Sequence, residues 1–379
     1  MQVNVKAKPG HVLSGSNLRR VFNSQQAGLV LVILVVAGIV SVIAGDQTVV
    51  KRETQPDGTV KVYDVTQNKL LNADVLVNYA KDTSFIAIMA VGMTAVVITG
   101  GIDLSVGSVY ALAGVVGAMV LHYFGPLGGS QAPWLGTMLG IGTAIGVALL
   151  CGLLNGVAAV GLRVHPFIIT MGTMWIFRGL ATVSTKAMSI GDFPDPLLSM
   201  IRSDLGLGSS LQPVPLLLMA IMAILGTMYL SATVAGRHVY AVGGNLETSR
   251  FSGLRTGRII VSVYVLVGLC AGIATTLASG IYGAAGSTRG AGYELNVIAA
   301  AVVGGASLSG GRGTALGAVL GAMLIQLLDQ SITTLGVDQN YNRIIIGCAI
   351  IVAVVLDQVS RRLTVRRLTA AARLSRVEA

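Results

Sequence analysis

The sequence predicts an all-α, polytopic membrane protein with about ten transmembrane helices, some of them short or broken. Three observations predict this fold. The 379 residues are 53% hydrophobic and 11% charged, whereas a soluble domain carries about 25% charged residues. The chain also divides into apolar runs of the length that a bilayer crossing requires. Finally, its 49 glycines follow no Gly-X-Y period, which fits closely packed membrane helices rather than collagen.

Apolar runs define the predicted spans. They are 27–45, 84–100, 105–124, 134–161, 167–185, 214–232, 259–281, 294–308, 314–335 and 343–359. The runs 84–100 and 294–308 are short for a full crossing, because a helix rises only about 1.5 Å per residue. The first run follows Arg19 and Arg20, so a cleaved signal peptide is the alternative for it. Its long apolar core favours an uncleaved first helix.

Basic residues predict that both termini face the cytoplasm, because short cytoplasmic loops are enriched in lysine and arginine. This orientation places 16 of the 26 basic residues inside. They are Lys6, Lys8, Arg19, Arg20, Arg163, Arg237, Arg250, Arg255, Arg258, Arg312, Arg361, Arg362, Arg366, Arg367, Arg373 and Arg376. The opposite segments 46–83 and 186–213 hold more acidic than basic residues. The net charge of +10 therefore reflects topology, and no basic face interleaved with aromatics indicates nucleic acid.

The chain is expected to form a single transmembrane domain over 1–379. Its predicted parts outside the spans are a cytoplasmic N-terminal segment at 1–26, an external loop at 46–83, a cytoplasmic loop at 233–258 and a basic cytoplasmic tail at 360–379. Within the external loop, residues 47–66 alternate apolar and polar side chains around Pro56, Asp57 and Gly58. This pattern predicts a small β-hairpin.

No catalytic residue, cofactor or metal site is predicted. Cys151, Cys270 and Cys348 lie in apolar stretches without metal-ligand spacing, and the four histidines are scattered. No lysine follows a glycine, so the chain has no phosphate-binding loop of the G-x-x-x-x-G-K-[ST] type, and it lacks H-E-x-x-H and G-x-S-x-G. An enzyme is therefore not expected.

A predicted helix break lies at residues 99–108, TGGIDLSVGS. Gly100 and Gly101 end one helix, and Asp103 or Ser105 can cap the next. Such breaks expose backbone polar groups to a substrate path inside membrane proteins. A tight turn at the membrane surface is the alternative interpretation.

Three further stretches carry polar or glycine-rich signals. Residues 152–181 contain Asn155 and Arg178 around a proline that can start a helix. Residues 236–254, GRHVYAVGGNLETSRFSGL, predict a short helix capped by Asn245 in a cytoplasmic loop, unless they form an ordinary surface loop. Residues 290–322 contain two double glycines, which permit helix breaks or simply close packing.

These four stretches, in this order, resemble the motifs of the permease subunits of ribose-, xylose- and galactose-type ABC sugar importers, over about residues 84–359. The resemblance implies a permease in the bacterial inner membrane that does no chemistry of its own. Its implied partners are a separate cytoplasmic ATPase subunit, a periplasmic sugar-binding protein, membrane lipid, and a second permease chain that is either identical or related. Neither motif nor resemblance selects among a pentose, a hexose or a related polyol.

Polar residues beside glycine or proline breaks are the expected substrate path. They are Asp103, Ser105, Asn155, Thr170, Glu294 and Asn296. The resemblance further implies that the 236–254 stretch forms the helix that docks on the ATPase. Its expected coupling residues are Gly243, Gly244, Asn245, Glu247, Arg250, Ser252 and Gly253. Thr248 and Ser249 stand where small alanines are usual, and Phe251 adds bulk, so the contacts with the ATPase are expected to differ in detail.

Two other classes of protein stay open at this stage. An ion-coupled secondary transporter would need buried carboxylates as a relay, because charges inside a bilayer are costly unless they are used. The ionisable candidates are few and most lie near span ends, where snorkelling or capping explains them. They are Asp103, Arg178, Glu294, Asp329 and Asp357. A membrane scaffold or receptor without transport would leave the broken, glycine-rich helices unexplained.

Overall fold

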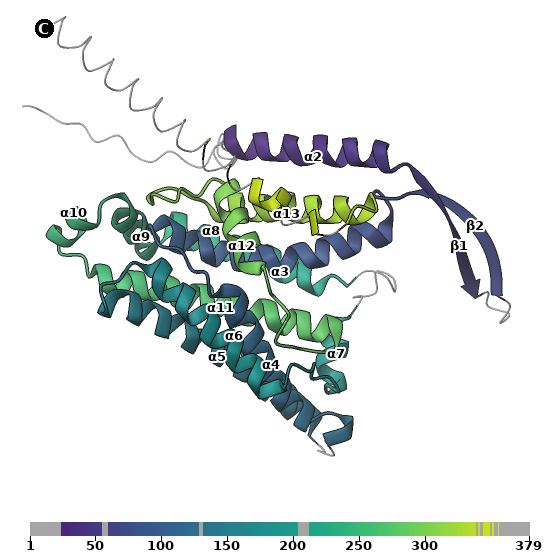
Figure 1. The fold of residues 1–379 in the computed structure, drawn as a ribbon, viewed down its shortest axis with the longest axis horizontal. Helices are drawn as coiled ribbons and strands as arrows, with labels where there is room; N and C mark the ends of the chain where they lie inside the picture. Colours follow the sequence, from purple (N-terminus) through teal and green to yellow (C-terminus); the bar gives the residue numbers. More distant parts are fainter. Residues whose placement is uncertain are drawn as a thin grey trace, which may run out of the picture.

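The computed structural model describes residues 24–54, 60–128, 132–203, 212–338, 340–341, 344–348, 351 and 355. Long helices run between the two ends of a bundle, with the short helices α9 and α10 at one end and a β-hairpin projecting beyond the other (Figure 1). The predicted N-terminal segment, up to residue 23, and the predicted tail at 360–379 lie outside the described residues.

The described elements follow the predicted spans in order. In the first half they are α2 (Ser24–Ala44), β1 (Asp46–Thr54), β2 (Val60–Asn68), α3 (Ala73–Ile98), α4 (Val106–Tyr123), the 3-10 helix η1 (Pro126–Gly128), α5 (Pro133–Gly161) and α6 (Pro166–Thr185). In the second half they are α7 (Asp195–Ile201), α8 (Val214–Ala232), α9 (Val234–Gly244), α10 (Leu246–Phe251), α11 (Thr256–Tyr282), α12 (Tyr293–Val303) and α13 (Ala315–Thr334). The helices α2, α3, α4, α5, α6, α8, α11 and α13 are long and apolar enough to cross a membrane. This confirms the predicted all-α membrane fold.

The two spans predicted to be short have different outcomes. Helix α3 starts at Ala73 instead of 84, because Asn72 caps it by accepting a hydrogen bond from the Val75 N–H at 3.0 Å. The end of the predicted 46–83 loop is therefore helical, and α3 is long enough for a full crossing. Helix α12, in contrast, has only 11 residues. The last predicted span, 343–359, is helical at 344–348 and otherwise lies mostly outside the described residues.

The predicted hairpin is confirmed. Strands β1 and β2 pair antiparallel, from Asp46 opposite Asn68 to Thr54 opposite Val60. Asn68 ties the hairpin to the end of α2, since its side chain accepts a hydrogen bond from the Ser41 hydroxyl at 3.1 Å and donates to the Gly45 carbonyl at 3.3 Å.

Helices α3 and α4 form the centre of the bundle. Within their most apolar 18-residue stretches, 89% of α3 and 72% of α4 is buried, against 11% in α2 and 17% in both α6 and α8. Most side chains of α2, α6 and α8 therefore face lipid or another chain. Small residues bring α5 against α11: a Cβ on Gly152 would lie 2.4 Å from the Tyr264 carbonyl oxygen, so the two backbones touch only because that residue is glycine.

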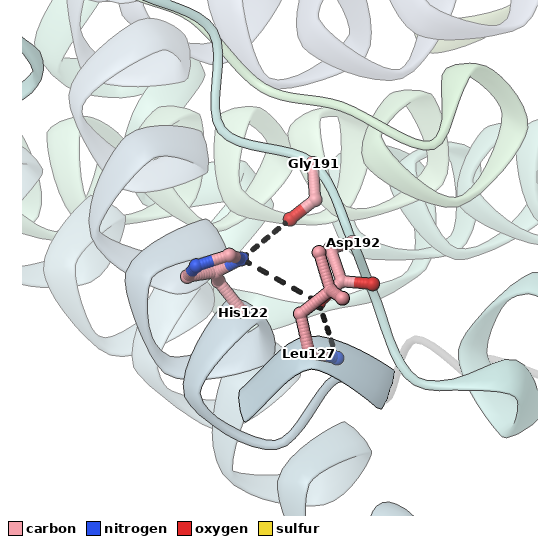
Figure 2. A network of polar contacts seen from close by, with 4 residues as sticks. All are labelled: His122, Leu127, Gly191 and Asp192. Atoms are coloured by element: carbon pink, nitrogen blue, oxygen red, sulfur yellow. Dashed lines mark hydrogen bonds and ion pairs between the residues drawn. The ribbon is translucent and has the colours of Figure 1, made fainter. Parts of the chain in front are cut away.

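At the end of the bundle opposite α10, a network of polar contacts joins the loop after α6 to the end of α4 (Figure 2). Asp192, in the loop after α6, accepts a hydrogen bond from the Leu127 N–H in η1 at 2.9 Å. His122, near the end of α4, lies 3.0 Å from the Gly191 carbonyl oxygen and 3.8 Å from the Asp192 carboxylate. Because Ile190 also bridges to Ala285 after α11, this loop joins α4, α6 and α11 at one point.

Candidate functional site

The predicted break between α3 and α4 is present and spans residues 99–105. Thr99 caps the C-terminus of α3, and Gly100 follows with a φ of 79°, a conformation that glycine adopts without strain. Ser105 occupies the N-cap position of α4 but makes no side-chain cap. Instead, the Asp103 Oδ1 accepts hydrogen bonds from the Ser105 N–H at 2.8 Å and from its hydroxyl at 2.7 Å. The carboxylate thus holds the turn that starts α4.

Two neighbouring helices complete a polar cluster around this break. Asn155 of α5 donates from Nδ2 to the Ser105 hydroxyl oxygen at 2.6 Å. Thr170 of α6 accepts a hydrogen bond from the Leu104 N–H at 3.1 Å and donates to the Ile102 carbonyl at 3.2 Å. The side chains of this polar cluster, Asp103, Ser105, Asn155 and Thr170, are all fully buried. Four of the six predicted path residues therefore meet at one site.

The polar cluster has two unmatched acceptors. Among the described residues, neither the Asp103 Oδ2 nor the Asn155 Oδ1 has a hydrogen-bond partner, although both atoms are buried. A buried polar atom without a partner costs about 1–3 kcal/mol, and native proteins hold few of them. Unmatched acceptors of this kind fit hydroxyl donors, supplied by water or by a ligand.

A cavity of about 790 Å³ lies beside the polar cluster, towards α10. Its walls include the backbone of 99–101, Arg163 and His165 between α5 and α6, and Arg250 of α10. Tyr264 of α11 also lines this cavity, while its hydroxyl donates to the Ile102 carbonyl at 3.4 Å. This buried tyrosine thus contacts both the cavity and the break.

Glu294 and Asn296 belong to a different place. Glu294, in the first turn of α12, accepts a hydrogen bond from the Gly292 N–H at 3.1 Å. Its Oε2 is buried without a described partner and lies at the first turn of α4, since a Cβ on Gly107 would come within 2.4 Å of it. Asn296 is half-buried further along α12. The structure therefore divides the six predicted residues into two groups.

The segment before α12 is held by Arg178 of α6. Its guanidinium donates to the carbonyls of Ser287 at 2.6 Å, Arg289 at 2.7 Å and Gly290 at 3.1 Å. The sequence analysis explained Arg178 by snorkelling or capping, whereas its fork binds a second helix interruption at 283–292. A membrane-embedded cation was the signal for this role. Tyr264 was missed, although a tyrosine hydroxyl in an apolar helix requires a partner.

The predicted coupling residues lie at the end of α9, within α10 and at the two ends of α10. Asn245 caps α10 by accepting a hydrogen bond from the Thr248 N–H at 2.9 Å, as predicted. Glu247 lies in the first turn and is exposed, whereas Arg250 turns back, 3.3 Å from the Thr256 hydroxyl at the start of α11. Ser252 and Gly253 end the helix. Phe251 is 92% exposed, and helix α9, which precedes this segment, was not predicted.

Comparison with known proteins extends over most of this architecture. Residues 75–354 match the family described as branched-chain amino acid transport system / permease component. The ribose import permease protein of Escherichia coli is 36% identical over 288 residues, which is 74% of this chain and 85% of that protein. The D-allose transport system permease protein of Escherichia coli is 34% identical over 277 residues, 73% of this chain and 81% of that protein.

A third relative is named for autoinducer 2 rather than for ribose or allose. The autoinducer 2 import system permease protein of Yersinia enterocolitica is 29% identical over 315 residues, 79% of this chain and 88% of that protein. The family match begins inside α3, so it leaves out α2 and the hairpin and contains both helix interruptions.

Proposed function

The chain belongs to the family of transport-system permease components that matches residues 75–354, and from this membership we propose that it is the membrane-spanning permease of an ATP-driven sugar importer. The observation that carries the proposal is the similarity, over roughly three quarters of the chain, to permeases named for ribose and D-allose. The family description names branched-chain amino acids, so the relatives rather than the family favour a sugar.

The chemistry of the polar cluster favours the same substrate class. A sugar offers many hydroxyl donors and no charge, and the unmatched Asp103 and Asn155 oxygens accept such donors. A free amino acid would require a cation for its carboxylate, and the described hydrogen-bond partners of the cluster include none. A pentose, a hexose or a related polyol fits this chemistry.

We infer that the substrate path passes the break at 99–105. Asp103, Ser105, Asn155 and Thr170 would contact the sugar when the bundle opens, and the neighbouring cavity of about 790 Å³ would form its cytoplasmic exit. Glu294 and Asn296 would lie on the same route at the second interruption. Lipid and a second permease, identical or related, would cover the poorly buried faces of α2, α6 and α8.

The remaining partners follow from the same proposal. A periplasmic binding protein delivers the sugar at the hairpin end, and a separate cytoplasmic ATPase docks on α10 through the exposed Glu247 and its neighbours. Both termini face the cytoplasm of a bacterial cell, in which this chain lies in the inner membrane. ATP binding and hydrolysis then move the permease pair between outward-facing and inward-facing states.

Uptake of labelled sugars tests the proposal. A panel of pentoses, hexoses and polyols is offered to the source cells with and without the gene, once with ATP depleted and once with the proton gradient collapsed. The expected result is that uptake of one sugar requires the gene and ATP but survives loss of the gradient. A Glu247→Ala, Arg250→Ala double variant is expected to remain in the membrane and lose accumulation of that sugar.

The same experiment can contradict the proposal. Uptake that follows the proton gradient would instead support the ion-coupled secondary transporter. If the uptake of every sugar in the panel persists without the gene, this chain does not import sugar. Normal accumulation by the double variant would remove α10 from the coupling role while leaving the importer intact.

A further inference from the structure

Three segments that are distant in the sequence meet at the last residue of α3. The Ile98 carbonyl accepts a hydrogen bond at 2.8 Å from the Gly311 N–H, in the loop 304–314 between α12 and α13. Gly243, near the end of α9, packs directly on this bond. A Cβ placed on Gly243 would lie 1.6 Å from the Ile98 oxygen and 2.8 Å from the Gly311 nitrogen. Only glycine fits at this position.

The contact is made of backbone on all sides. A Cβ on Gly310 would lie 2.6 Å from the Gly243 carbonyl oxygen and 3.0 Å from that of Ile98. Gly310 and Gly311 have φ values of 82° and 75°, which glycine adopts without strain. We call Ile98, Gly243, Gly310 and Gly311 the glycine junction. Because no flexible side chain separates these backbones, one segment cannot shift without displacing the others.

A second contact joins the same elements. Tyr240, one turn before Gly243 on α9, donates its hydroxyl hydrogen to the Gly313 carbonyl at 2.7 Å. The loop 304–314 is also tied within itself, since the Ser307 N–H donates to the Arg312 carbonyl at 3.0 Å. The loop and α9 are therefore held together as one unit.

The glycine junction lies between the proposed ATPase contact and the polar cluster. On one side, Gly243 is two residues before Asn245, the cap of α10. On the other side, Ile98 is the last residue of α3, and the break that contains Asp103 follows it directly. We propose that the glycine junction transmits displacement of α9 and α10 to this break and to the start of α13. This inference rests on the proposed function, in which the ATPase moves α10.

Two glycines offer a matched test. Gly243→Ala inserts a methyl group into the glycine junction, whereas Gly161→Ala, at the end of α5, places one where nothing lies within 4 Å. Each variant is reconstituted with the ATPase in lipid vesicles, and the sugar transported per ATP hydrolysed is measured. Gly243→Ala is expected to lower this ratio by about tenfold, in the range typical of coupling between sites. Gly161→Ala is expected to keep the wild-type ratio.

A readout independent of the sugar separates this inference from the proposed function. Amide hydrogen exchange at 99–105 is compared in the complex with and without a non-hydrolysable ATP analogue. The wild type and Gly161→Ala are expected to show a nucleotide-dependent change, and Gly243→Ala is expected to show none. A wild type that imports no sugar but shows this change would overturn the proposed substrate and leave the junction in place.

Tyr240→Phe covers the case in which Gly243→Ala does not assemble. It removes the hydroxyl group that binds the Gly313 carbonyl. We expect a smaller nucleotide-dependent change in amide exchange at 99–105 and less sugar transported per ATP hydrolysed. The inference is overturned if the first variant that assembles keeps both the wild-type ratio and the wild-type exchange response. It is also overturned if the wild type itself shows no nucleotide-dependent change at 99–105.

Discussion

The two helix interruptions of this protein are held to neighbouring helices in different ways. The break at 99–105 is held from within by the Asp103 carboxylate and from α5 and α6 by the uncharged Asn155 and Thr170, and its polar cluster leaves two buried acceptors unmatched. The interruption at 283–292 is held by the Arg178 guanidinium, which binds three carbonyls. Charged hydrogen bonds are roughly twice as strong as neutral ones. Segment 283–292 is therefore anchored to α6 by a cation, whereas 99–105, tied to its neighbouring helices by neutral hydrogen bonds, is able to rearrange.

The largest effect is expected where the anchored interruption loses its cation. Arg178→Met leaves the carbonyls of Ser287, Arg289 and Gly290 without their described donor. Because each acceptor that loses its partner costs about 1–3 kcal/mol, the fold should be destabilised by about 3–5 kcal/mol. Thermal unfolding of the detergent-solubilised permease measures this. The same substitution at the exposed Arg258 is the control and should have little effect. Equal stability of the two variants would mean that Arg178 is not an anchor.

An opposite pair of effects is expected at the polar cluster. Asp103→Asn replaces a buried carboxylate by an uncharged amide, which costs less to bury, so stability should rise by about 1 kcal/mol. The same change removes an acceptor for sugar hydroxyls, so transport should fall by about tenfold, the effect of some 1.4 kcal/mol. Thermal unfolding and vesicle uptake are measured on the same preparation. Unchanged transport would remove Asp103 from the substrate path.

The smallest effect is expected at the contact between α6 and the break. Thr170→Val keeps the shape but leaves the Leu104 N–H without its described acceptor, which should cost about 1 kcal/mol. Thr173→Val on the same helix is the matched control, because the Thr173 hydroxyl donates only to the Thr170 carbonyl at 3.3 Å. If both variants unfold at the same temperature, the break does not depend on α6.

The comparison also separates what sequence patterns can predict from what they cannot. Span positions follow from hydropathy, and the caps at Asn245 and Gly100 follow from local chemistry. The early start of α3 was missed because residues 73–83 contain polar side chains that interrupt the apolar run. The Asn72 cap, and not hydropathy, sets that boundary.

Long-range contacts were beyond the sequence analysis. Asp103, Asn155 and Thr170 are each polar in apolar surroundings, and this is why they were predicted. No sequence pattern indicates that they meet at one site. Nor does any pattern indicate that Glu294 lies at the start of α12, away from them. From the sequence, the double glycine at 310–311 is compatible either with a helix break or with close helix packing. The structure shows both at once, since these residues end a turn and touch Gly243.

The glycine junction consists of main-chain atoms alone, apart from the Ile98 side chain. A contact between main-chain atoms does not depend on which molecule the permease transports. Under the proposed function, the side chains around the break select the imported molecule, and they can diverge while the backbone contact stays the same. Related permeases could therefore change substrate by exchanging residues around the break, while the contact that links the break to α9 and α10 stays the same.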